Sequence, residues 1–191
     1  MASKLVYRQP KLKIKQPDTI QNMRSGNAER IISLLEKSRR PLIAAGLTAR
    51  RLGIHPYLLP FLDKYNIPVV LTPMAKGIIG ENHPSYAGVL FHALSDYLED
   101  LWHKTDLVIG IGYDPVEYNY ESWIPGVPLI HFDTRETDMP DTIDVLQYAG
   151  APAEWFNILE KLNAGSIIPE PGIIKGIRDE MISVFEGFTN R

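Results

Sequence analysis

Short apolar runs bounded by glycine or proline alternate along the chain with segments in which apolar residues recur at helical spacing. Near-continuous apolar strands separated by helices are typical of a parallel sheet covered on both faces, so the pattern predicts a doubly wound α/β domain. The short runs predict strands at 41–45, 68–71, 107–111, 127–132 and 143–148. The helical spacing predicts one helix that begins at Asp18 or Asn27 and ends before Arg39. It predicts further helices at 54–65, 93–104, 151–162 and 173–188.

One predicted helix contains a conformational obstacle. Pro60 lies inside the helical pattern at 54–65, so that helix is expected to begin later or to bend there.

In open parallel sheets, ligands bind beyond the carboxyl ends of the strands, so the residues that follow each predicted strand are candidates for a site. Glycines there let a ligand approach the backbone closely, and Asp133 is placed as a ribose-binding carboxylate would be. The alternative is plain turn chemistry, with Lys76 solvated and Asp133 capping the next segment. The candidate cofactor-binding residues are Gly46, Thr72, Lys76, Gly110, Gly112, Tyr113, Asp133 and Thr134.

The motifs that identify nucleotide sites and common active sites are absent from this sequence. Gly110-Ile-Gly112 is followed by Tyr113-Asp-Pro115, so no third glycine completes a dinucleotide fingerprint, and no phosphate-binding G-x-x-x-x-G-K-[ST] loop occurs. The histidines lack metal-binding spacing, and no G-x-S-x-G nucleophile elbow is present. His131, inside an apolar strand, is predicted to be a core residue. We therefore predict no catalytic residue and no metal ligand.

Composition narrows the functional classes further. The 191 residues suit one domain and contain no cysteine, which excludes disulfides, thiol nucleophiles and iron–sulfur clusters. A net charge of −3 gives no general reason to bind nucleic acid or an anionic membrane. No apolar run approaches the roughly 18 residues that span a bilayer. The expectation is a soluble cytoplasmic protein.

The chain divides into three expected parts. Residues 1–24 form a basic arm that suits either phosphate contact or a solvated linker, 25–163 form the α/β domain, and 164–191 form a linker and a last helix. Tyr and Trp residues gather around Glu117 and Glu121, in a loop that favours contact with a neighbouring domain or subunit, with a nucleobase as the alternative. These aromatic residues are Tyr113, Tyr118, Tyr120 and Trp123.

An ordered series of short segments carries a resemblance to a known family. The series runs through Arg40-Pro-Leu-Ile-Ala-Ala-Gly46, Asn66-Ile-Pro-Val-Val-Leu-Thr72, Met74-Ala-Lys-Gly77, His83-Pro84, Ala87-Gly88, Thr105-Asp-Leu-Val-Ile-Gly-Ile-Gly112 and Leu129-Ile-His-Phe-Asp133. Over about residues 25 to 163 the chain resembles the central domain of thiamine-diphosphate-dependent enzymes of the acetolactate synthase and pyruvate decarboxylase group. Gly112-Tyr-Asp-Pro-Val-Glu-Tyr118, with Trp123 after it, is similar to the catabolic acetolactate synthases in particular.

The resemblance implies a six-stranded parallel sheet of the NAD/FAD-binding type shared with sirtuins and electron-transfer flavoproteins. In some relatives this domain holds FAD or a regulatory adenine nucleotide. Flavin-binding synthases usually have an arginine where this chain has Tyr113, and Gly150 is followed by Ala151 where the family has Gly-Asp. The departure at Tyr113 weakens the case for FAD.

The resemblance also implies what this chain lacks. Thiamine diphosphate and magnesium are held in the family by flanking domains that supply a glutamate and a Gly-Asp-Gly motif, and no Gly-Asp-Gly occurs here. We therefore expect a non-catalytic central domain that links catalytic domains or partner subunits, contributes to an oligomer and is inactive alone. The alternative is a free-standing subunit that binds FAD, NAD or ADP, like the epsilon subunit of archaeal carbon monoxide dehydrogenase complexes.

Overall fold

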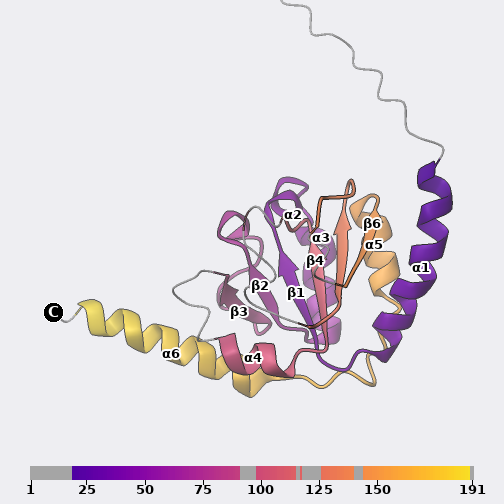
Figure 1. Ribbon diagram of the computed structural model, residues 1–191. Coiled ribbons are helices and arrows are strands. Elements are labelled where there is room, and N and C mark those ends of the chain that lie inside the picture. The colour runs from indigo at the N-terminus through magenta and orange to yellow at the C-terminus, as the bar shows by residue number, and fades with distance from the viewer. Residues whose placement is uncertain (1–18, 91–97, 115–116, 118–125, 140–143, 190–191) are drawn as a thin grey trace, which may run out of the picture.

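A six-stranded parallel sheet organises the protein. The computed structural model describes residues 19–90, 98–114, 117, 126–139 and 144–189. The strand order is β3-β2-β1-β4-β5-β6, so the chain crosses over at β1 and β4, the two central strands (Figure 1). The strands are β1 (Pro41–Ala45), β2 (Val69–Leu71), β3 (Tyr86–Val89), β4 (Leu107–Ile111), β5 (Leu129–Asp133) and β6 (Val145–Ala149).

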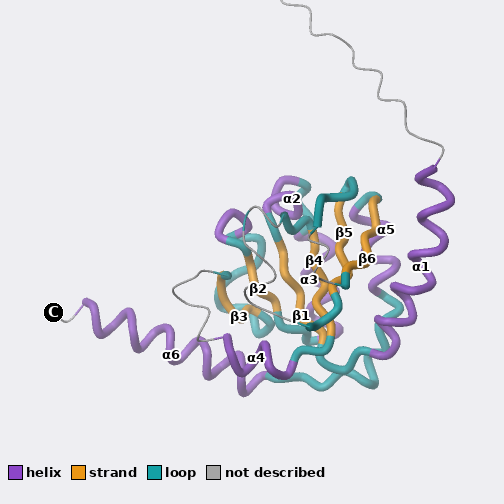
Figure 2. Tube along the Cα trace, in the orientation of Figure 1, coloured by secondary structure: helices purple, strands orange, loops and turns teal. Residues whose placement is uncertain are grey.

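Helices lie on both sides of this sheet (Figure 2). On one face, α1, α3 and α5 pack around Ile43 and Ile109; on the other, α4 and α6 pack around Leu42 and Val108. Neighbouring strand residues belong to opposite clusters because side chains alternate across a strand. The helices are α1 (Thr19–Lys37), α2 (Leu47–Arg51), α3 (His55–Tyr65), the 3₁₀ helix η1 (Pro73–Ala75), α4 (Glu99–Lys104), α5 (Pro152–Leu159) and α6 (Pro171–Thr189).

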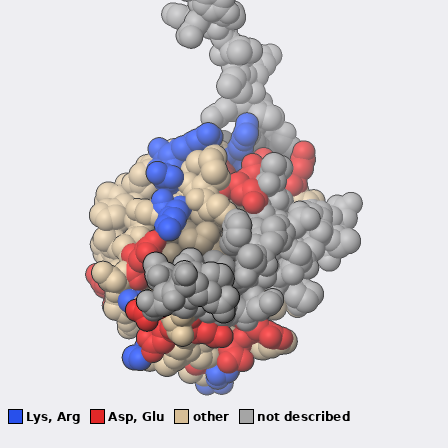
Figure 3. All heavy atoms as spheres, turned by 90° about the vertical axis from the view of Figure 1, so that its left-hand side faces the viewer, with Lys and Arg blue, Asp and Glu red and all other residues tan. Residues whose placement is uncertain are grey.

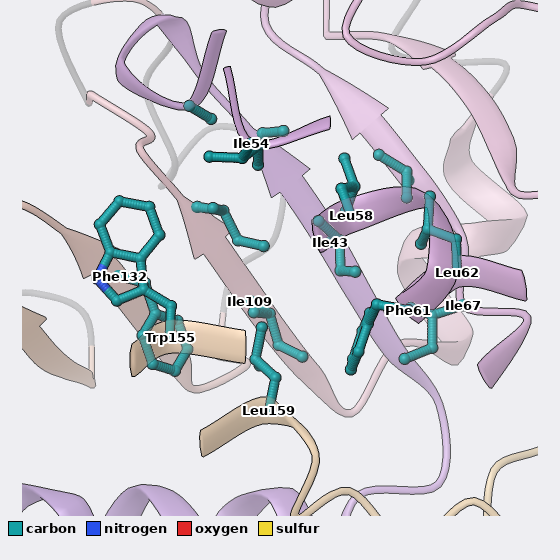
Figure 4. Packing of buried hydrophobic residues seen from close by; sticks show 14 of the residues in the cluster. Ile43, Ile54, Leu58, Phe61, Leu62, Ile67, Ile109, Phe132, Trp155 and Leu159 are labelled. Carbon is teal, nitrogen blue, oxygen red and sulfur yellow. The ribbon is translucent and has the colours of Figure 1, made fainter. Parts of the chain in front are cut away.

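The larger core cluster joins the sheet to α3 and α5 (Figure 4). Leu58, Phe61 and Leu62 come from α3, while Trp155 and Leu159 come from α5, and each is at most 2% exposed. Burying a side chain of this size stabilises a fold by about 1.5 to 3 kcal/mol. This packing confirms the doubly wound α/β prediction.

The sequence pattern missed two short elements. β3 (Tyr86–Val89) is four residues long and contains Gly88, so the apolar pattern did not predict it, and only the family resemblance implied a sixth strand. α2 (Leu47–Arg51) has five residues, too few for a helical period to stand out. α4 is described only from Glu99, and the earlier part of that predicted helix lies outside the described residues.

Pro60 does not delay the start of α3. The helix begins at His55 with Pro56 in its first turn and continues through Pro60 to Tyr65. A proline inside a helix removes one backbone hydrogen bond. Here the ring is exposed on the outer surface of the helix, while the inner face of α3 is held by buried Phe61 and Leu62.

The amino-terminal edge of the sheet is tied together by one carboxylate. Asp106 accepts hydrogen bonds from the Ser38 hydroxyl at 2.6 Å and from the Arg39 and Arg40 backbone N–H groups at 2.8 and 3.1 Å. The segment that leads to α6 joins the same edge, because the Ile168 N–H donates to the Arg39 carbonyl at 2.8 Å. The connection to α6 is therefore anchored to the domain. None of the helices among the described residues is long and apolar enough to cross a membrane.

Candidate functional site

Three of the predicted residues meet where β1, β2 and β4 end. The Gly46 N–H donates to the Ile111 carbonyl at 3.0 Å, and the Thr72 N–H donates to the Ala45 carbonyl at 2.9 Å. Gly112 follows β4 directly, and its carbonyl accepts the Thr48 N–H at 3.2 Å. The strand order reverses at this point, which is where ligands enter open α/β folds.

Both glycines are required for close contact between backbone segments. Gly112 has φ +54°, and a Cβ atom there would lie 2.2 Å from the Ala49 nitrogen. A Cβ atom on Gly46 would lie 2.3 Å from the Gly112 carbonyl oxygen. The start of α2 thus packs directly against the end of β4, and not even a methyl group fits between them.

The carboxylate of Glu117 lies at the junction of these strand ends, the position of the ligand crevice in open α/β folds. Its two oxygens lie 2.9 and 3.2 Å from the Leu47 nitrogen, whose N–H donates to them. The hydroxyl of buried Thr72 donates to the same carboxylate at 2.6 Å. In nucleotide-binding domains of this topology, a phosphate takes the N–H groups at the first turn after β1. Here the chain's own side chain takes that N–H group.

The remaining predicted residues lie elsewhere or have other roles. Lys76 pairs with Glu81 at 3.1 Å, and both side chains are more than 60% exposed. Gly110 lies within β4, where an added Cβ would be 3.2 Å from the His131 ring. Its lack of a side chain therefore makes room for His131 in the core. Asp133 accepts hydrogen bonds from the N–H and hydroxyl of exposed Thr134 at 2.5 and 3.0 Å. The Asp133 carboxylate therefore bonds to the segment that follows it, as in the turn-chemistry alternative to a ribose-binding role.

Tyr113 is fully buried and connects the crevice to His131. The His131 Nε2–H donates to the Tyr113 carbonyl at 2.6 Å, which fixes the neutral tautomer with its proton on Nε2. His131 Nδ1 has no hydrogen-bond partner within the described residues. Gln147 lies beside it on the neighbouring strand. The Gln147 amide oxygen accepts the Thr137 N–H at 2.8 Å, and its amide nitrogen donates to the Thr137 carbonyl at 2.9 Å.

Burial lowers the pKa of His131 below its ordinary value, against smaller opposing effects from the Tyr113 carbonyl and Asp133. The unfolded chain therefore takes up a proton first as pH falls below about 6.5, and the free energy of unfolding decreases from there down to the folded pKa. We expect His131→Gln to remove this part of the acid dependence. Urea titrations of both proteins between pH 7.5 and 5 measure it, and parallel stability profiles would contradict the expectation.

Glu117 is the site residue that the sequence did not assign to the crevice. It was grouped with the aromatic loop, although Asp114-Pro115 marks a turn just before it, and the Glu117 N–H does donate to the Asp114 carbonyl at 2.9 Å. The Glu117 carboxylate lies over the strand ends, where it bonds to Leu47 and Thr72. Tyr118, Tyr120, Glu121 and Trp123 lie outside the described residues.

Removing the Glu117 carboxylate is expected to weaken the fold. Glu117→Ala leaves the Leu47 N–H and the buried Thr72 hydroxyl without their acceptor, which costs about 1.5 to 3 kcal/mol of unfolding free energy. Glu117→Gln keeps one acceptor oxygen and costs about half as much. Urea unfolding at pH 7 measures both, with Glu136→Ala, an exposed carboxylate, as a control within about 0.5 kcal/mol of the parent. Equal stabilities of Glu117→Ala and Glu136→Ala would contradict the assigned contacts.

Comparisons with known proteins agree on one family. Residues 28–162 match the model of the thiamine pyrophosphate enzyme central domain. The chain is 29% identical over 132 residues to a probable acetolactate synthase large subunit of Methanococcus aeolicus, which covers 68% of this chain and 22% of that protein. It is 31% identical over 94 residues to pyruvate decarboxylase isozyme 2 of Saccharomyces cerevisiae, covering 49% of this chain and 17% of that one.

A solved structure shares the fold. A candidate thiamin diphosphate-dependent enzyme from Mycobacterium smegmatis superposes with a TM-score of 0.57 at 20% identity, over 75% of this chain and 30% of that one. The present chain thus spans about a fifth of the length of the curated relatives that it matches.

Proposed function

The chain belongs to the thiamine pyrophosphate enzyme family by its central domain, residues 28–162, and on this premise we propose that it is the non-catalytic middle domain of an acetolactate synthase-like enzyme. In that role it links catalytic domains or partner subunits and contributes to their assembly. We keep the division into a basic arm at 1–24, a domain at 25–163 and a linker with helix at 164–191 as part of this proposal.

The single observation that carries an architectural role is the Glu117 carboxylate in the crevice. The N–H of Leu47 and the hydroxyl of Thr72, which would face a nucleotide phosphate, are both bonded to it. The Gly46 and Gly112 backbones close the space behind them. The groups at this strand edge therefore stabilise the fold itself. The alternative of a free-standing subunit that binds FAD, NAD or ADP gains no support from this geometry.

Thiamine diphosphate and magnesium belong, in this proposal, to the parent enzyme. The chain contains no Gly-Asp-Gly motif, and the described residues hold no group of three histidine, aspartate or glutamate side chains placed to bind a metal ion. The described residues therefore do not fit thiamine diphosphate with magnesium, and no catalytic step is assigned to this chain.

Two measurements on the purified chain test the proposal. Thermal unfolding with ADP, FAD, NAD, or thiamine diphosphate plus magnesium is expected to give the same midpoint as without ligand. A ligand present at 100 times its Kd would add about 2.7 kcal/mol of stability, or several degrees in a domain of this size. Pyruvate turnover is expected to be absent, with a full-length acetolactate synthase as the positive control. A nucleotide-dependent shift, or pyruvate consumption by the chain alone, would overturn the proposal.

A further inference from the structure

A basic patch surrounds exposed apolar side chains at the carboxyl edge of the sheet. Arg50 and Arg51 on α2 are exposed, and the Arg50 guanidinium donates to the Met74 carbonyl of η1 at 3.0 Å, which ties the two elements together. Leu52 is 42% and Met74 52% exposed. Neither arginine has an ion pair among the residues that the structure describes. The basic patch consists of Arg50, Arg51, Leu52, Met74 and Lys76.

An acidic patch lies on α4 and α6. Leu98, the residue before α4, and Met181 of α6 come close over Gly88, where a Cβ atom would lie 3.8 Å from the Met181 sulfur and 4.0 Å from Leu98 Cδ2. Beside this contact Ile182 is 54% exposed. The acidic patch consists of Glu99, Asp100, Asp179, Glu180 and Ile182.

The charges of the acidic patch are only partly balanced locally. Glu99 faces His103, and Asp179 pairs with Lys175 one helical turn away. Asp100 and Glu180 have no ion pair within the described residues. The patch therefore keeps a negative charge around its apolar side chain.

The two patches lie toward opposite ends of the domain. α2 lies where the strands end, whereas α4 and α6 lie where they begin (Figure 1). Figure 3 shows Lys and Arg side chains along the upper left of this face, with Asp and Glu side chains beside them at the upper right, and a further group of Asp and Glu side chains at the bottom, among a few basic ones. Three of the four large apolar side chains that are exposed among the described residues, Leu52, Met74 and Ile182, lie in the two patches.

We propose that copies of this chain associate end to end, with the basic patch of one copy on the acidic patch of the next. An apolar centre inside a rim of one charge sign fits an apolar centre inside a rim of the opposite sign. Arg50 and Arg51 carry two positive charges without an ion pair among the described residues, whereas Lys76 pairs with Glu81. Asp100 and Glu180 carry two negative charges that likewise have no ion pair there. A contact between two different patches is heterologous, so each copy keeps one patch available for a further copy.

The association is expected to be weak and sensitive to salt. Patches of five residues each bury less than the roughly 1,200 Å² of stable complexes, and exposed charges are screened over about 3 Å at 1 M salt against about 10 Å at 0.1 M. Sedimentation velocity of the full chain, from about 10 to 500 µM, is expected to show an average mass that rises with concentration in low salt. At 1 M salt the association constant is expected to fall at least fivefold.

Charge reversal on one patch at a time tests the pairing. Arg50→Glu with Arg51→Glu, and separately Asp100→Lys with Glu180→Lys, are each expected to leave a monomer throughout. All four side chains are exposed, and circular dichroism melts check that each variant folds. A matched control, Lys37→Glu with Lys161→Glu, makes the same charge change as the arginine variant outside both patches and is expected to associate like the parent.

Mixing the two reversed variants gives the decisive result. The arginine variant keeps an intact acidic patch and the acidic variant keeps an intact basic patch, so a 1:1 mixture is expected to associate although neither partner associates alone. A parent chain that stays monomeric at 500 µM in low salt, an arginine variant that associates like the parent, or a mixture that stays monomeric would overturn the proposal. Neither nucleotide binding nor pyruvate turnover enters this test, so its failure is separate from that of the proposed function.

Discussion

Gly112→Ala is expected to be among the most damaging single substitutions in the domain. The residue has φ +54°, and the new Cβ would lie 2.2 Å from the Ala49 nitrogen and 2.9 Å from the Thr48 carbonyl carbon. Left-handed backbone costs a non-glycine residue about 1 to 2 kcal/mol, and forced overpacking adds about 1 to 3 kcal/mol. We expect the unfolding free energy to fall by roughly 2 to 5 kcal/mol, measured by urea unfolding at 25 °C.

Gly53→Ala is the matched control. Gly53 has a similar φ of +62°, but nothing lies within 4 Å of its Cβ position, so only the backbone cost of about 1 to 2 kcal/mol applies. The difference between the two variants therefore measures the close contact between α2 and the end of β4. Equal losses at both positions would show that this contact does not constrain the fold.

The close contact explains how a nucleotide-binding topology can serve an architectural role. In a nucleotide-binding domain a ligand lies against the first turn after β1. Here the backbone of Gly112 packs against that turn, at Gly46 and Ala49. Glu117 then bonds to the N–H of Leu47, the first residue of α2. The strand order alone predicts a ligand crevice at this point. In this chain the Glu117 side chain, which follows β4, occupies that position instead of a ligand.

The sequence predicted the central strands because their burial is complete. Every residue of 41–45 and of 107–111 is buried on both faces of the sheet, and such strands read as continuous apolar runs. The helix predicted at 151–162 has the same cause, since Trp155, Phe156 and Leu159 recur at helical spacing and all three are buried. Local sequence patterns suffice to predict a strand or helix where burial of its apolar side chains dominates its structure.

The site was only partly predictable because it depends on contacts between distant segments. Gly46, Thr72 and Gly112 were found from strand-end position alone, and the structure brings them together. Glu117 lies 70 residues from Leu47 and 45 from Thr72, and no local pattern relates their positions. Lys76 follows β2 as a phosphate-binding lysine would, but it pairs with nearby Glu81 and remains exposed.

Trp155→Ala is expected to destabilise the domain to a similar extent, by about 3 to 5 kcal/mol, because it leaves a large cavity between α5 and the sheet. Trp155 is fully buried in the core cluster that also contains Phe132, Ile109 and Leu159. Its indole N–H has no hydrogen-bond partner within the described part of the chain. A buried donor without an acceptor costs about 1 to 3 kcal/mol, so the side chain stabilises the fold through its ring and despite its nitrogen.

Trp155→Phe separates these two contributions. Phenylalanine keeps one aromatic ring in the same position and removes the unpaired N–H, so the lost packing is largely offset and the expected change is within about 1.5 kcal/mol of the parent. Chemical unfolding of both variants, followed by far-ultraviolet circular dichroism, gives the two free energies on one scale. A phenylalanine variant as unstable as the alanine variant would mean that the indole nitrogen has a partner that matters for the fold. The ordering expected here instead assigns the contribution of Trp155 to the packing of its ring, beside that of Phe156 and Leu159, and not to its indole nitrogen.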